Sequence, residues 1–155
     1  MAKISHENEP LILPERVPPN KQVGGDHYVS PYMHWDWAIL CGMSGLEYAA
    51  TKYLARWEKK GGVQDIEKAV HYLEKLLQSV EDGLAFPPTR HLPEGYIRKE
   101  TERFLEVNGI AGSAAECMRY CSTWRDPIEL KAALGYAREL LYLVNGTEKV
   151  EKDGV

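Results

Sequence analysis

Four basic side chains in the first half of the chain recur at helical spacing and together could bind a phosphate group. Lys52 and Arg56 lie four residues apart, so one helix would carry both on the same side. Lys60 and Lys68 extend the charge along the chain. Arginine offers a planar fork of donors and lysine a point charge, a mixture that suits phosphate oxygens. Such charges are also typical of a solvated helix face, and the spacing alone leaves both interpretations open.

Candidate contacts to a base or sugar lie on either side of these cations. His27 and Tyr28 follow two glycines in a stretch that we expect to be a shaped loop, and both could stack on a nucleotide base. Asp65 and Tyr72 would lie on a polar helix face, with Asp65 either paired with Lys68 or acting as the helix N-cap. The aromatic side chains could instead belong to the core. No residue stands out as catalytic, and no histidine or cysteine spacing predicts a metal site.

A helical hairpin over Gly42–Leu77 is expected to position most of these residues. The Gly61-Gly62 pair predicts a tight turn between its two helices. Apolar spacing predicts that the first helix buries Leu46, Ala50, Tyr53 and Trp57, and that the second buries Ile66, Ala69, Val70, Leu73, Leu76 and Leu77. An antiparallel hairpin would gather the cations and Asp65 into one pocket. There, Arg56→Ala is expected to weaken ligand binding with little change in thermal stability.

The second half of the chain repeats the first. A constant offset of 67 residues places Gly42 on Gly109, Gly45 on Gly112, Lys52 on Arg119, Tyr53 on Tyr120, Trp57 on Trp124, and Trp37 opposite Phe104. Beyond the turn the offset is 64, which places Tyr72 on Tyr136, so the second copy is three residues shorter at its turn. Thr123 replaces Arg56 and Ala132 replaces Lys68. We therefore expect the first half to bind a ligand and the second to support it.

The predicted fold is all-α, with two pseudo-symmetric helical hairpins that are each preceded by a short helix. Proline and glycine content places the boundaries between these parts. The chain is expected to contain a flexible arm at 1–22, a first helical repeat at 23–81, a linker at 82–96, a second helical repeat at 97–145 and a polar tail at 146–155.

Composition excludes several classes of function. The net charge of −4 over 155 residues argues against general nucleic-acid binding, which needs a basic excess. No apolar run approaches the roughly 20 residues of a membrane span. Three cysteines without a Cys-x-x-Cys pair fit a reducing, cytoplasmic setting. The aromatic residues of the two predicted hairpins exceed what one small helical pair easily hides, so a homo-oligomer is expected.

The segment from Gly24 to Leu77 resembles the phage-encoded SaV-like family of small proteins, one branch of which is a nucleotide kinase without a P-loop. The residues that carry this resemblance are His27-Tyr28, Lys52-Tyr53, Arg56, Lys60, Asp65, Lys68-Ala69 and Tyr72. The family often has Gly-Asn where this chain has Tyr48-Ala49. The resemblance covers about a third of the chain and implies binding of a nucleotide, with ATP and magnesium as cofactors if the chain is a kinase.

The leading functional hypothesis is therefore a nucleotide-binding, phage-type protein with phosphoryl transfer to a nucleoside monophosphate as its implied activity. Gly42-Met43-Ser44-Gly45 is not a P-loop, because it lacks the Gly-Lys-Ser/Thr ending. The first alternative is a non-catalytic binder that sequesters a nucleotide or a nucleotide-derived signal. The second is a small phage adaptor that binds a host protein through its helical surface.

Overall fold

The computed structural model describes residues 30–153, with side chains through residue 146, and helices are the regular secondary structure of this part of the chain. Its six helices are α1 (His34–Leu40), α2 (Gly45–Arg56), α3 (Val63–Glu81), α4 (Glu94–Val107), α5 (Gly112–Thr123) and α6 (Pro127–Asp153). The predicted all-α class is confirmed, with two hairpins, α2–α3 and α5–α6. The helix before the first hairpin is short, with 7 residues, but α4 before the second has 14 and is longer than the 12-residue α5. None of these described helices is long and apolar enough to cross a membrane. His27 and Tyr28 lie outside the described residues.

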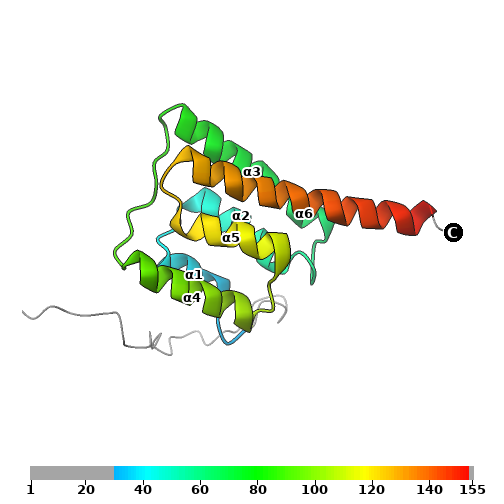
Figure 1. Ribbon diagram of the computed structural model, residues 1–155, viewed down its shortest axis with the longest axis horizontal. Helices are drawn as coiled ribbons and strands as arrows, with labels where there is room; N and C mark the ends of the chain where they lie inside the picture. Colours follow the sequence, from blue (N-terminus) through cyan, green and yellow to red (C-terminus); the bar gives the residue numbers. More distant parts are fainter. Residues whose placement is uncertain (1–29, 154–155) are drawn as a thin grey trace, which may run out of the picture.

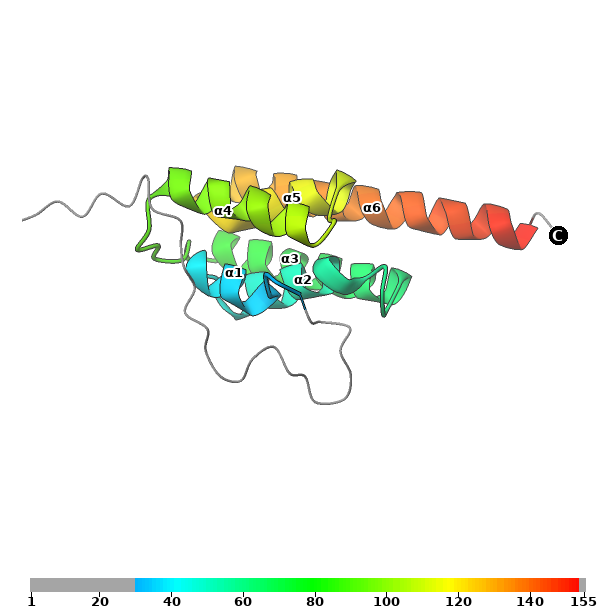
Figure 2. The same cartoon turned by 90° about the horizontal axis from the view of Figure 1, so that it is seen from below.

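The six helices form two layers. Figure 2 shows α1, α2 and α3 in one layer and α4, α5 and α6 in the other. Across the two layers α1 contacts α4, α2 contacts α5, and α3 contacts α6. Each helix therefore meets its own counterpart in the other repeat, which is the arrangement of a pseudo-twofold axis running between the layers.

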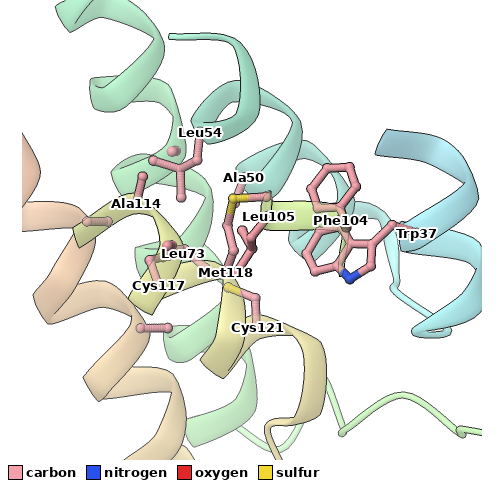
Figure 3. Packing of buried hydrophobic residues seen from close by; sticks show 14 of the residues in the cluster. Trp37, Ala50, Leu54, Leu73, Phe104, Leu105, Ala114, Cys117, Met118 and Cys121 are labelled. Atoms are coloured by element: carbon pink, nitrogen blue, oxygen red, sulfur yellow. The ribbon is translucent and has the colours of Figure 1, made fainter. Parts of the chain in front are cut away.

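Equivalent residues meet each other on this axis. The rings of Trp37 and Phe104 stack with their centroids 4.7 Å apart and their planes 4° from parallel, and Figure 3 shows this pair in the interior. At the opposite edge, Arg138 and its counterpart Glu74 form an ion pair of 3.3 Å. The repeat predicted from glycine and aromatic spacing is thus visible as direct contact between matched positions.

The two hairpins also repeat an internal contact. Tyr53 stacks on Tyr72 with a centroid distance of 5.9 Å, and their counterparts Tyr120 and Tyr136 stack at 6.0 Å. The turn between α2 and α3 spans six residues, 57–62, whereas the turn between α5 and α6 spans three, 124–126. The three-residue difference falls at the turn, as the change in offset predicts.

The buried side of α2 differs from the predicted stripe. Ala50 is buried as expected, but Leu46, Tyr53 and Trp57 are only half-buried. The fully buried positions of this helix are Glu47, Ala50, Thr51 and Leu54. The difference arises because α2 is the middle helix of its layer and contacts α1, α3 and α5. The buried face of α2 is turned toward α5, while Tyr53 of the predicted stripe lies at the side of the helix and stacks on Tyr72 of α3.

The predicted apolar face of α3 is largely confirmed. Ile66, Ala69, Val70, Leu73 and Leu76 are buried, and Leu77 is half-buried. Leu73 lies with Leu54 of α2 and with Cys117 and Met118 of α5 in the cluster drawn in Figure 3. The layers therefore share one core.

Buried polar side chains join the two layers. Glu47 accepts hydrogen bonds from the backbone N–H of Ser44 at 2.6 Å and from the indole N–H of Trp124 at 3.0 Å, and the Ser44 hydroxyl also donates to it. The Tyr32 hydroxyl donates to Glu100 at 3.0 Å, and the Trp37 indole N–H donates to Thr101 at 3.0 Å. Buried hydrogen bonds of this kind fix one packing of the layers, because an unpaired polar group would be costly.

Two boundaries differ from the expected ones. The last helix runs on through residue 146 to Asp153, so most of the predicted polar tail is helical. In Figure 1 this end of α6 projects beyond the other helices. The helix after the linker begins at Glu94, three residues before the predicted repeat at 97.

Candidate functional site

Arg56 and Asp65 form a two-point ion pair that closes the α2–α3 hairpin. The Arg56 Nε lies 3.0 Å from Asp65 Oδ2, and its Nη2 lies 3.1 Å from Oδ1. The Arg56 side chain is 14% exposed and the Asp65 side chain 2%. A guanidinium held at two points has one fixed orientation, so this cation is positioned before any ligand arrives.

The turn between the helices explains why Asp65 reaches Arg56. Gly62 is the N-cap of α3 with φ 57°, in the left-handed region that favours glycine. A Cβ on Gly61 would lie 2.1 Å from the Asp65 carboxyl carbon, so only glycine leaves room for the carboxylate over the turn. Asp65 is therefore neither the N-cap of α3 nor the partner of Lys68, the two roles expected from the sequence; its ion pair is with Arg56.

Arg56, Asp65 and Lys68 form a cluster around the ring of Tyr53, which we call the platform. The Arg56 guanidinium carbon lies 4.6 Å from the Tyr53 ring centroid, and the Lys68 Nζ lies 5.1 Å from it. Both distances fit cation–π contacts. Since Tyr72 stacks on the same tyrosine, the structure brings together four predicted site residues around one that was assigned to the core.

The other two predicted cations flank this cluster. Lys60 is exposed in the turn, and its backbone N–H donates to the Arg56 carbonyl at 3.0 Å. Lys52 is half-buried on α2, near the first helix. Burial, and secondarily the charge of Lys52, lower the pKa of His34 to about 3. The His34 ring therefore stays neutral at physiological pH, with its Nε2 2.8 Å from the Thr51 hydroxyl.

The low pKa of His34 makes stability depend on pH. The ring has a pKa near 6.5 in the unfolded chain and about 3 in the folded one. Between these values the unfolded chain binds a proton that the folded chain does not, so stability is lost as the pH falls. We expect His34 to account for a loss of about 2 kcal/mol in the free energy of unfolding between pH 7 and pH 5.

Urea denaturation at both pH values checks this expectation. Parent and His34→Gln are compared, because glutamine keeps a hydrogen-bonding group but cannot titrate. The parent should lose more stability than the variant on acidification. An equal loss in both would show that His34 does not titrate as its burial predicts.

The second repeat keeps the tyrosine platform but not the cations. Thr123 and Ala132 stand where the first repeat has Arg56 and Lys68, and Thr123 is buried. Glu129, the counterpart of Asp65, instead accepts a hydrogen bond of 2.7 Å from the backbone N–H of Arg125. The expected asymmetry between the copies is therefore an asymmetry of charge around a shared pair of stacked tyrosines.

Arg119, the counterpart of Lys52, is engaged by acids. It pairs with Glu102 at 2.6 Å and with Glu116 at 2.8 Å. The hydrogen bond from Arg119 lowers the pKa of the Glu102 carboxyl. At the equivalent surface of the second repeat, two carboxylates thus offset the charge of the one arginine.

Metal and thiolate chemistry find no support in the described residues. No group of three or more His, Cys, Asp or Glu side chains there could hold a metal ion. Burial raises the pKa of the Cys41 thiol to about 12, and the pKa of Cys121 is also raised, chiefly by its hydrogen bond with Cys117. These thiols stay protonated at neutral pH and are poor nucleophiles.

Two features were missed at the sequence level. The role of Tyr53 could have been found, since the Tyr53–Tyr72 and Tyr120–Tyr136 pairs fall on the two repeat offsets. Arg90 in the linker gave no such signal. Its Nη1 donates to the Trp124 carbonyl at 2.9 Å, its Nε and Nη2 are buried without a hydrogen-bond partner, and burial lowers its pKa.

Comparison of the chain with protein-family models, with curated proteins and with solved structures found no match.

Proposed function

We propose that the first repeat binds a nucleotide or a nucleotide-like small molecule through its phosphate groups. One observation carries this proposal: Arg56 is oriented by Asp65 over the Tyr53 ring, and Lys68 lies over the same ring. Lys68 offers a phosphate a point charge, and Arg56, whose Nε and Nη2 already donate to Asp65, adds a fixed positive charge beside it. Lys52 and Lys60 add positive charge on either side of this platform.

The resemblance to the phage SaV-like family supports the same location. Its motif residues in α2 and α3 coincide with the cluster around Tyr53, from Lys52 to Tyr72. We propose kinship with that family on this ground. His27, Tyr28 and Tyr72 are then proposed to contact the base or sugar. Asp65, whose side chain is 2% exposed and paired with Arg56, is proposed to orient that guanidinium rather than to contact the ligand.

Phosphoryl transfer to a nucleoside monophosphate is the activity proposed first. Such transfer depends mostly on positioning and on neutralising charge, which the cations of this cluster would provide. ATP and magnesium would be the cofactors, and the protein would act in the cytoplasm of a host cell.

One observation favours a non-catalytic binder instead. Asp65, the carboxylate of the cluster, is 2% exposed and held by Arg56, so it is poorly placed to accept a proton from a substrate hydroxyl. A protein that sequesters a nucleotide or a nucleotide-derived signal needs only the cations and the platform. A phage adaptor for a host protein ranks third.

Incubation with ATP, magnesium and a panel of nucleoside monophosphates separates these functions. Both product formation and retained ligand are measured. New nucleoside diphosphate identifies a kinase, and a retained ligand without product identifies a binder. If neither product nor retained ligand is detected, the nucleotide-binding proposal is overturned and the adaptor function is left.

Replacing Lys68 by alanine should weaken nucleotide binding by roughly ten- to a hundredfold, the effect of losing one charge-assisted contact. The fold should survive, because Lys68 is half-buried and its contact with Tyr53 contributes little to stability. Lys75→Ala is the matched control, since Lys75 is an exposed lysine on the same helix. Calorimetric titration of both variants checks this, and equal affinities would count against a role for Lys68.

A further inference from the structure

The outer face of α3 and α6 carries a pattern typical of helices that dock on other helices. On α6, exposed residues recur at alternating steps of three and four: Ile128, Lys131, Gly135, Arg138 and Tyr142. Residues at alternating steps of three and four lie in one line along a helix, which we call the seam. Coiled-coil helices contact each other along such a line. Ile128 is 77% exposed and Tyr142 79%, so two large side chains of this seam face solvent. In Figure 1, α3 and α6 run together along the upper edge of the molecule.

Charge is divided between the two helices of this face. On α3 the acids Glu67, Glu74 and Glu81 recur every seven residues, and all three are exposed. On α6 the bases Lys131 and Arg138 have the same spacing. Within the chain, Arg138 pairs with Glu74 at 3.3 Å and Lys131 with Glu81 at 3.5 Å. Along this seam α3 therefore presents acids and its antiparallel neighbour α6 presents bases, and two of the pairs are in register.

A hollow of about 510 Å³ lies between the two helices on this face. Leu77 and Leu134 line it together with the four charged residues of the ion pairs and Gln78. The hollow thus combines apolar contact surface with a border of alternating charge.

Gly135 lies at the centre of the seam, and neither its backbone conformation nor its surroundings in the chain require a glycine. A Cβ at this position would meet nothing within 4 Å. Glycine in the middle of a helix destabilises it relative to alanine, so its presence here calls for a reason. A second helix that approaches the backbone closely would supply that reason.

We propose that a second copy of this chain docks on the α3–α6 face, with the twofold axis parallel to the two helices. A rotation about this axis moves each helix to the opposite side of the face and leaves its position along the axis unchanged. It therefore places α3 of each copy on α6 of the other, with Glu74 and Arg138 at the same height. Glu74 and Arg138 of both copies then form a closed ring of four alternating charges. Leu84, which is 79% exposed just beyond the end of α3, lies at the same end of the face as Ile128 near the start of α6.

The charges on α3 and α6 indicate that the partner on this face is a second copy of the chain. A partner for the basic seam of α6 must bring acids at a seven-residue spacing, and α3 brings them in the matching register. Opposite charges across an interface steer association and fix the register of docking. This inference does not rest on nucleotide binding, since the residues of the face are distinct from those around Tyr53.

Sedimentation equilibrium across a concentration series tests the proposal. The parent should approach twice the 17.6 kDa mass of the chain, and Gly135→Leu should weaken association by at least about tenfold. Leucine favours the helix more than glycine, so this variant should remain folded by circular dichroism. Gly95→Leu is the control, because Gly95 lies on α4 and a Cβ there also meets nothing within 4 Å. It should associate as the parent does.

Exchanging the charges of Glu74 and Arg138 tests whether the dimer forms through the α3–α6 face rather than through another surface. Arg138→Glu alone should leave a monomer, because it sets like charges against each other within and between copies. The double variant Glu74→Arg/Arg138→Glu restores both contacts and should restore the dimer. A parent that keeps the mass of one chain throughout, or a Gly135→Leu variant that associates like the parent, would overturn the proposal.

Discussion

Replacing Trp124 by alanine is expected to lower the free energy of unfolding by about 3 to 5 kcal/mol. The side chain is fully buried, and it packs against Leu76 and Leu130. Its indole N–H also donates to the buried carboxylate of Glu47. The substitution therefore leaves a large cavity and removes a donor from a buried acid, and the two losses act in the same direction.

Trp57→Ala is the matched control, since Trp57 is the counterpart of Trp124 in the first repeat and is only half-buried. Urea denaturation of both variants measures the difference. The Trp57 variant should lose clearly less stability. Equal losses would show that the two repeats contribute alike to the core and that the hydrogen bond to Glu47 adds nothing.

Arg56→Ala is expected to lower the free energy of unfolding by about 3 to 5 kcal/mol, the usual effect of removing one partner of a buried ion pair. The reason is Asp65, whose side chain is 2% exposed and would lose its two-point partner. This outcome reverses the sequence-based expectation that the substitution spares stability. Loss of ligand binding in this single variant would therefore be ambiguous.

Arg119→Ala provides the comparison for this effect. The Arg119 side chain is 38% exposed and its ion pairs lie at the surface, where such pairs contribute at most about 1 kcal/mol. Thermal and urea unfolding of both variants checks the contrast. A small loss for Arg56→Ala would mean that water reaches Asp65 and that the pair does not close the hairpin.

The repeat could be predicted because glycines and aromatic residues mark fixed points of a helical hairpin. Gly42 and Gly109 both have positive φ, 69° and 65°, at equivalent points in the loop between the first and second helices of each copy. A glycine required by the backbone persists in both repeats, and so does a tyrosine that stacks on another. These signals act over short distances along the chain, where sequence spacing is informative.

The buried face of α2 could not be predicted in the same way. Glu47 is a charged residue and would be expected at the surface. It is nevertheless fully buried, because Ser44 and Trp124 donate hydrogen bonds to its carboxylate. Trp124 comes from the other layer of the fold. Apolar periodicity does not register a hydrogen bond between residues 77 positions apart.

Four of the predicted site residues, Arg56, Asp65, Lys68 and Tyr72, lie together around Tyr53, but their contacts were not predicted. The spacing of Arg56 and Lys68 put both cations near the turn, as found. The partner of Asp65 depended on the conformation of Gly61 and Gly62, since these glycines bring the carboxylate back over the turn. Tyr53 followed the apolar pattern and was therefore assigned to the core rather than to the site.

The most direct test of the central claim is calorimetric titration of nucleotide into the double variant Arg56→Met/Asp65→Leu. Leucine has nearly the shape of aspartate, and two apolar side chains leave no buried charge or amide unpaired, so this variant should keep a melting temperature close to that of the parent. Binding is expected to weaken by about tenfold or more, because the oriented guanidinium is gone. A folded double variant that binds nucleotide as tightly as the parent would contradict the claim that the cluster around Tyr53 is the binding site.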